Sequence, residues 1–273
     1  KAFLLPRGRA LVLFIWHTFF SFVYALYVSN FGGDALMYYQ EAQVGIAEFS
    51  FGVSSVIFIA NLIYKFTDLS FLGLGISFSI FGVIGLLAFD ASLRHVTRDT
   101  SRNIKLLAVI IVLLPSISFW SAGLGKDAIA FMATGLALWA SLNLTKHKLL
   151  MVFAIASMLL VRPHMAGLMV IALTFAVMTD KNANILQRIF FGSVVLVALL
   201  LMVPFALDYA GVQDVSVQGL MSYIKIRESY NWEGYGGGID ISSMSLLMKM
   251  FTYLFRPLPF EANSISKFMA SVD

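Results

Sequence analysis

The feature that most constrains this chain is a series of long apolar runs, separated by short stretches that carry most of its charge. The first run, residues 10–28, contains no Asp, Glu, Lys or Arg, and a helix needs roughly 20 apolar residues to cross the hydrocarbon core of a bilayer. Charged residues make up 12% of the chain, against about 25% in a typical soluble domain. The sequence therefore predicts an all-α, polytopic membrane helix bundle.

Charge and cysteine content exclude several kinds of function. A net charge of +4 is too small to indicate nucleic-acid binding and reflects the loop charges that orient a membrane protein. The chain has no Cys, which excludes disulfides, thiolate nucleophiles and thiolate metal sites. It does not begin with Met and it stops at Asp273, so we expect truncation at one or both ends.

The basic residues set the expected topology. Lys1, Arg7 and Arg9 precede the first run, and positive charge favours the cytoplasmic side. We interpret this run as a retained first span, because the hydrophobic core of a signal peptide is only about 7–15 residues long. A crossing at residues 49–66 would move the basic stretch 94–105 out of the cytoplasm. We therefore expect interfacial helices in this part of the first outer loop.

The remaining runs complete a single membrane domain over residues 1–273, with about seven or more transmembrane helices. Residues 149–161 and 165–178 are expected to form a hairpin, because one continuous helix of about 45 Å would overshoot a core of about 30 Å. The other expected spans are residues 10–28, 69–89, 104–119, 128–144 and 189–207, followed by a short apolar segment at 244–255. The outer loops are then about 29–68, 116–127, 162–164 and 208–243.

Polar residues that lie far apart in the sequence fall on the outer side of this topology. Ionisable residues at membrane depth are costly and tend to mark a substrate path or a buried pair. Their convergence on one face is therefore the main functional signal in the sequence. They are Asp34, Tyr38, Tyr39, Lys126, Asp127, Arg162, His164, Arg256 and Glu261.

The first of these residues have a structural and a functional interpretation. Asp34 follows two glycines, so it can cap a helix. Alternatively it is a carboxylate base, with Tyr38 one helical turn further along the same face. Lys126 is either a surface lysine among lipid headgroups or, at a helix start where the dipole disfavours a cation, part of a phosphate site. Asp127 is expected to cap that helix or to pair with Lys126.

The same two interpretations apply to Arg162 and His164, which flank a proline. Arg162 is either a snorkelling arginine beside a helix-start proline or a bidentate phosphate ligand, and His164 can act as an acid or a neutral donor. His17, inside the first span, is expected to be packed or hydrogen-bonded. No cofactor is predicted, although Asp34 with Glu41 leaves a divalent cation open.

Four motifs carry a family resemblance. Behind a basic N-terminus and a first span, the chain reads GGDALMYYQ, PSISFWSAGLGKDAI, LLVRPH and YLFRPLPFEA. This combination resembles integral membrane glycosyltransferases of the GT-C type and polysaccharide polymerases of bacterial cell-envelope gene clusters. The resemblance implies a multi-pass protein of the bacterial inner membrane with a cytoplasmic N-terminus. It also implies that Asp34 is the catalytic base and that Lys126, Arg162 and Arg256 are cations near the donor phosphate.

The other outer residues complete the expected site, and the chain departs from the GT-C pattern in three ways. We expect Tyr38, Tyr39 and His164 to bind substrate and Asp127, Glu41 and Glu261 to support the site. The predicted crossings are fewer than GT-C enzymes usually have, and Glu41 is the one match for a second acidic residue in the first outer loop. The sequence also shows no soluble outer domain.

These observations predict a glycosyltransferase in the lipid bilayer that acts at the outer face. It transfers a hexosyl or pentosyl group from a polyprenyl-phosphate-linked donor to a saccharide or lipid acceptor. The alternative is a non-enzymatic transporter or flippase for the same lipid-linked saccharide. A transporter normally places its substrate groups near the membrane midplane. A structural scaffold would instead pair the outer charges among themselves and leave no cavity.

Overall fold

The computed structural model describes residue 3, residues 6–45 and 49–179, short stretches and single positions between 184 and 226, and residues 244–255 and 258–261. The chain divides into two compact units, Lys1–Leu199 and Leu200–Asp273. The first unit carries all the expected site residues from Asp34 to His164, and the second carries Arg256 and Glu261. The single membrane domain stays a prediction.

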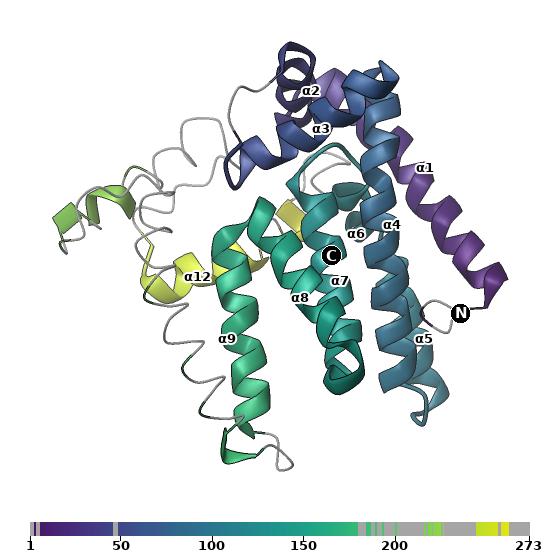
Figure 1. The fold of residues 1–273 in the computed structure, drawn as a ribbon, viewed down its shortest axis with the longest axis vertical. Coiled ribbons are helices and arrows are strands. Elements are labelled where there is room, and N and C mark those ends of the chain that lie inside the picture. Colours follow the sequence, from purple (N-terminus) through teal and green to yellow (C-terminus); the bar gives the residue numbers. More distant parts are fainter. Residues whose placement is uncertain are drawn as a thin grey trace. The chain divides into compact units, whose positions relative to one another are not determined.

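Every regular element in the described residues is a helix (Figure 1), which confirms the predicted all-α class. The first unit contains α1 (Arg7–Phe31), α2 (Asp34–Val44), α3 (Val53–Thr67), α4 (Phe71–Val96), α5 (Arg102–Val112), α6 (Pro115–Ser121), α7 (Lys126–Ser141), α8 (Leu144–Val161) and α9 (Pro163–Thr179). The second unit contains α12 (Leu246–Phe255) and the short 3-10 helix η2 (Pro259–Glu261).

Within the described residues, four segments are long and apolar enough to cross a membrane: α1, α4, α8 and the combined stretch of α5 and α6. Apolar side chains on α1 face outward, and Leu11, Ile15 and Leu26 are each more than half exposed. A continuous apolar surface of this kind suits lipid and is rare on a soluble monomer. The structure therefore supports a membrane protein with several spanning helices.

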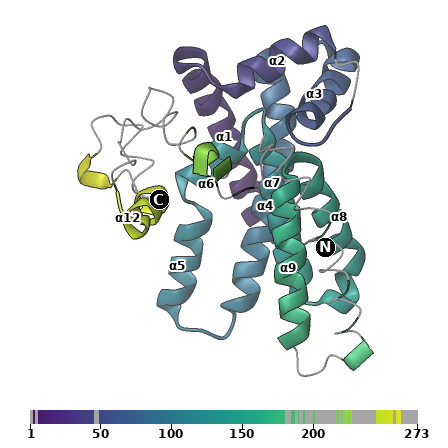
Figure 2. The ribbon, with the colours of Figure 1, turned by 90° about the vertical axis from the view of Figure 1, so that its left-hand side faces the viewer.

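Because only part of the chain is described, the predicted seven or more crossings stay a prediction beside the four membrane-length segments found there. The predicted spans 128–144 and 165–178 correspond to α7 and α9, whose 16 and 17 described residues are close to the lower limit of about 17 for a crossing. Residues 189–207 lie largely outside the described residues. Helix α3 has 15 residues and lies with α2 at one end of α4 (Figures 1 and 2). Its interfacial position stays a prediction.

The centre of the first unit is a close crossing of α4 and α7. A Cβ atom added to Gly85 of α4 would lie 2.8 Å from the backbone nitrogen of Met132, and one added to Gly135 of α7 would lie 2.4 Å from the carbonyl oxygen of Gly85. The two backbones are therefore in direct contact, which is the packing that small residues allow between helices in membranes. The position of α7 depends on these two glycines.

A buried carboxylate joins α1 to α4. Asp90 is fully buried, and its carboxylate accepts hydrogen bonds from the Nε of Arg9 at 2.9 and 3.1 Å and from the Nε of Arg94 at 3.1 Å. A second guanidinium nitrogen of Arg9 lies 2.5 Å from Asp90. A buried charge needs partners of this kind, because an unpaired carboxylate in a low-dielectric interior is very unfavourable.

Further polar contacts hold the helices together. His17 is fully buried and its Nε2 lies 3.3 Å from the carbonyl oxygen of Ser121, so the prediction that it is packed and hydrogen-bonded is confirmed. The Ser55 hydroxyl donates to the carbonyl of Leu160 at 2.6 Å, which ties α3 to the end of α8. The Asn61 amide donates to a carbonyl of α2 at 2.6 Å. Ser55 and Asn61, which interrupt the apolar run 49–66, therefore bind α3 to α8 and to α2.

Candidate functional site

The candidate site begins at the turn between α1 and α2. Helix α1 ends at Gly32, whose φ is 78°, and Gly33 has a φ of 151°, backbone conformations that glycine adopts without a steric penalty. Asp34 is the first residue of α2 and is exposed. In the described part of the chain, one hydrogen bond reaches its carboxylate, from the Tyr38 hydroxyl at 3.4 Å. Asp34 therefore does not act as a helix cap here.

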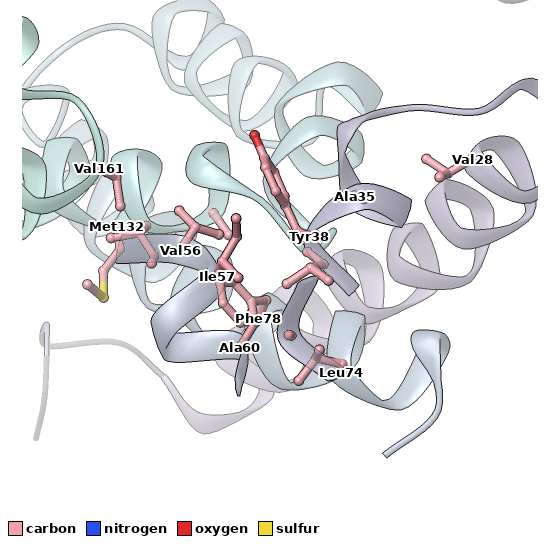
Figure 3. Packing of buried hydrophobic residues seen from close by; sticks show 14 of the residues in the cluster. Val28, Ala35, Tyr38, Val56, Ile57, Ala60, Leu74, Phe78, Met132 and Val161 are labelled. Atoms are coloured by element: carbon pink, nitrogen blue, oxygen red, sulfur yellow. The ribbon is translucent and has the colours of Figure 1, made fainter. Parts of the chain in front are cut away.

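Tyr38 links Asp34 to the rest of the site. Its side chain is 2% exposed, and Figure 3 shows its ring among the buried apolar side chains with the hydroxyl at their edge. Burial raises the pKa of the phenol, and the charges of Asp34 and Asp127 and the hydrogen bond to Asp34 raise this pKa further. Tyr38 therefore stays protonated at neutral pH and remains a donor to Asp34. The predicted placement of the two residues on one helical face is confirmed.

The loop before α7 packs on two tyrosines. A Cβ added to Gly123 would lie 2.1 Å from the ring of Tyr24, and one added to Gly125 would lie 4.0 Å from the ring of Tyr38. This packing sets the start of α7 at Lys126, so the prediction that the lysine begins a helix is confirmed. No ion pair of Lys126 occurs among the described residues.

Asp127 pairs with an arginine from a distant part of the chain. Its carboxylate lies 2.5 Å from a guanidinium nitrogen of Arg162, with the two side chains 50% and 35% exposed. The expected pairing of Asp127 with Lys126 is therefore not the ion pair that the structure describes. Arg162 closes α8, and Pro163 begins α9, so the predicted break between the two helices is confirmed. Within the described residues, the buried Nε of Arg162 has no hydrogen-bond partner.

His164 lies at the start of α9, beside the same cations. Its pKa is below the ordinary value, first because the ring is partly buried and then because Arg162 and Lys126 place positive charge near it. The neutral imidazole is therefore favoured at pH 7. Lys126 acts on this pKa although it precedes His164 by more than 30 positions in the sequence.

The structure thus brings together residues from three turns: Asp34 and Tyr38, Lys126 and Asp127, and Arg162 and His164. Asp127 connects the groups, since it pairs with Arg162 and its charge reaches Tyr38. The expected position of this group at the outer face of a membrane stays a prediction.

Among the described residues, Tyr39 and Glu41 form no hydrogen bond or ion pair with this group, and Glu261 and Arg256 belong to the second unit. The Tyr39 hydroxyl donates to the carbonyl of Leu69 at 3.4 Å, and the Tyr39 ring meets two other aromatic rings edge-on. Glu41 is exposed on α2. Glu261, in the second unit, accepts a hydrogen bond from the backbone of Leu258 at 3.0 Å. Arg256 lies outside the described residues.

Sequence reasoning missed Asp90. The predicted span was ended one residue before it, although an acidic residue four positions ahead of Arg94 in an apolar run is a signal for an intrahelical pair. The sequence also gave no sign that Arg162 would meet Asp127, because the two are 35 positions apart.

No group of three or more His, Asp or Glu side chains that could hold a metal ion occurs within the described part of the chain. No protein-family model, curated protein or solved structure matches this chain. The resemblance to GT-C enzymes therefore rests on the four short motifs.

Proposed function

We propose that this protein is a membrane glycosyltransferase or polymerase of the GT-C type, with more crossings than the four membrane-length helices described. It transfers a sugar from a polyprenyl-phosphate-linked donor to a saccharide or lipid acceptor at the outer face of a bacterial inner membrane. The observation that supports this proposal is the gathering of an exposed carboxylate and several basic side chains at the ends of helices. A lipid-linked sugar phosphate requires both kinds of group in one place.

Asp34 is the proposed base. Its carboxylate is exposed and receives one hydrogen bond, from Tyr38, so its remaining lone pairs are open to an acceptor hydroxyl. Asp34 takes the hydroxyl proton as the acceptor oxygen forms a bond to the anomeric carbon. The bond between that carbon and the phosphate oxygen breaks, and the polyprenyl phosphate leaves with the electron pair. A positioned base of this kind contributes about 10²–10⁴-fold to the rate.

Lys126 is the proposed partner of the leaving phosphate. Its charge is not neutralised by an ion pair within the described residues, and the first turn of α7 offers backbone N–H groups beside it. A helix N-terminus attracts phosphate, and fixed positive charge is most effective where negative charge develops during the reaction. Arg162 is the weaker candidate, because Asp127 already neutralises part of its charge.

The same charges would also bind the substrate of a flippase. A transport site is normally formed near the midplane of the membrane, whereas Asp34, Lys126 and Arg162 lie at the ends of helices. Their position favours transfer chemistry at a surface. A structural scaffold would pair the outer charges among themselves, as Asp127 and Arg162 do, but it gives no role to exposed Asp34 or to Lys126, which forms no ion pair with a described residue.

The test is sugar transfer by the purified protein in detergent, assayed with a panel of labelled polyprenyl-phosphate sugars and separation of lipid-linked from transferred label. Asp34→Asn is expected to reduce the rate at least 100-fold, because the amide cannot accept the proton. Lys126→Gln is expected to slow transfer about 10-fold or more. The matched controls are Asp68→Asn and Lys65→Gln, which change exposed residues of α3 and its C-terminus.

Transfer by Asp34→Asn at the rate of Asp68→Asn would show that the carboxylate is not the base. The flippase alternative would be supported by two results together. The parent protein would consume no donor, and vesicles that contain it would move a lipid-linked saccharide across the bilayer.

A further inference from the structure

The first unit contains a cavity at the end of α1 opposite the candidate site. Arg9 is near the start of α1 and Asp34 follows its end, and a helix of 25 residues is about 37 Å long. The cavity has a volume of about 360 Å³ and lies between α1, α4 and α5. Its charged lining residues are Arg9, Asp90, Arg94, Arg98 and Lys105.

The charge of this cavity is strongly positive. Four of its lining residues are cations and one is a carboxylate. The carboxylate of Asp90 already accepts hydrogen bonds from both Arg9 and Arg94. Arg98 and Lys105 are exposed and form no ion pair with any described residue. Two cations therefore remain available to an anion.

The rest of the cavity wall is apolar and continues onto an apolar helix face. Leu93, Ala108 and Val109 contribute to the wall. On α5, Leu106 and Ile110 flank these positions and are 58% and 52% exposed. Figure 2 shows that α5 is joined to α4 by the turn at residues 97–101, where Arg98 lies. A ligand bound here meets cations at one end and an apolar surface at the other.

We propose that this cavity binds the phosphate of an anionic membrane phospholipid, with the acyl chains along the exposed face of α5. Basic pockets between transmembrane helices bind anionic lipid headgroups in this way. A phosphate group alone would use Arg98 and Lys105 but would leave the apolar wall without a partner. The proposal concerns the end of the bundle opposite the candidate site, so it does not depend on the proposed transferase activity.

The experiment measures lipid binding to the full chain, purified in a non-ionic detergent at an ionic strength of about 0.15 M, where charges more than about 8 Å apart are largely screened. Labelled phosphatidylglycerol is compared with labelled phosphatidylcholine, which carries no net charge, and glycerol 3-phosphate serves as a soluble competitor. The test variant is the double substitution R98Q/K105Q, which leaves the ion pairs of Asp90 in place. The matched control is K146Q/K148Q, which removes two exposed lysines outside the cavity.

R98Q/K105Q is expected to weaken phosphatidylglycerol binding about 25-fold, since each cation close to an anionic lipid surface contributes a factor of roughly five. K146Q/K148Q is expected to change it by less than about 3-fold, because solvent ions screen distant charges. The charge-conserving R98K/K105R should bind nearly as well as the parent. Phosphatidylglycerol should bind more tightly than phosphatidylcholine, and equimolar glycerol 3-phosphate should not displace it.

Three outcomes would overturn the proposal. Equal binding of phosphatidylglycerol by the parent and by R98Q/K105Q would remove the cavity as the binding site. An equal loss of binding in K146Q/K148Q would indicate general surface attraction. Complete displacement by equimolar glycerol 3-phosphate would identify a soluble phosphate as the ligand and exclude the lipid.

Discussion

The crossing of α4 and α7 allows a sharp test of the fold with one substitution made at two places in the same helix. Gly85→Ala adds a Cβ that would lie 2.8 Å from the backbone of Phe131 and Met132, whereas the Cβ of Gly75→Ala would meet nothing within 4 Å. Carbon atoms pack at about 3.5–4.0 Å, so α7 must move by about 1 Å to accommodate Gly85→Ala. The neighbouring atoms are backbone and cannot rotate away.

The two variants isolate the cost of this displacement. Each replaces a helical glycine with alanine, which by itself favours the helix by about 0.5–1 kcal/mol, so this contribution cancels in the comparison. Overpacking a well-packed interior costs about 1–3 kcal/mol. Gly85→Ala is therefore expected to be less stable than Gly75→Ala by about 1–3 kcal/mol, or roughly 5- to 150-fold in the unfolding equilibrium.

The free energies are measured by unfolding both variants in mixed micelles of a mild detergent and sodium dodecyl sulfate, followed by tryptophan fluorescence. Gly135→Ala should resemble Gly85→Ala, and the double variant should be less destabilised than the sum of the two, because both substitutions force the same separation of the helices. Equal stability of Gly85→Ala and Gly75→Ala would refute the close contact of α4 with α7.

Three further predictions concern charged residues. Arg9→Gln leaves buried Asp90 with one arginine instead of two. It should lower the free energy of unfolding by about 2–3 kcal/mol, which is less than the roughly 3–5 kcal/mol lost when a buried charge has no remaining partner. A double-mutant cycle on Asp127 and Arg162 should give a coupling energy below about 1 kcal/mol, since both are partly exposed, and a value above about 2 kcal/mol would contradict this. The pKa of His164 is lowered from 6.5, so the unfolded chain takes up the proton first. The contribution of His164 to the free energy of unfolding should be complete above about pH 6.5 and should fall below that pH. Unfolding curves at pH 7 and pH 5 should therefore show a smaller loss of stability for His164→Gln than for the parent.

The local features of the site follow from sequence patterns with a short range. The glycine pair before Asp34 and its spacing from Tyr38 predict a helix start with both side chains on one face, and the structure has this arrangement. Proline after Arg162 predicts the break between α8 and α9. These predictions succeed because helix starts, breaks and one-turn contacts depend on residues within a few positions of one another.

Contacts over a long range could not be predicted in the same way. Asp127 could have paired with Lys126, its neighbour in the sequence, but the fold brings Arg162 to it. Asp90 is paired with an arginine 81 positions away, and nothing in the order of residues selects that partner.

The apolar runs alone determined that this chain forms helices in a membrane, since their length and lack of charge leave few other solutions. The tertiary structure alone decided which charges meet. The approach of α4 to α7 depends on Gly85 and Gly135 lying opposite each other, and the same packing of helices carries Lys126, Arg162 and His164 to one end of the bundle. Ion pairs form where packed helices place the charges, and packing depends on the shapes of surfaces that are far apart in the sequence.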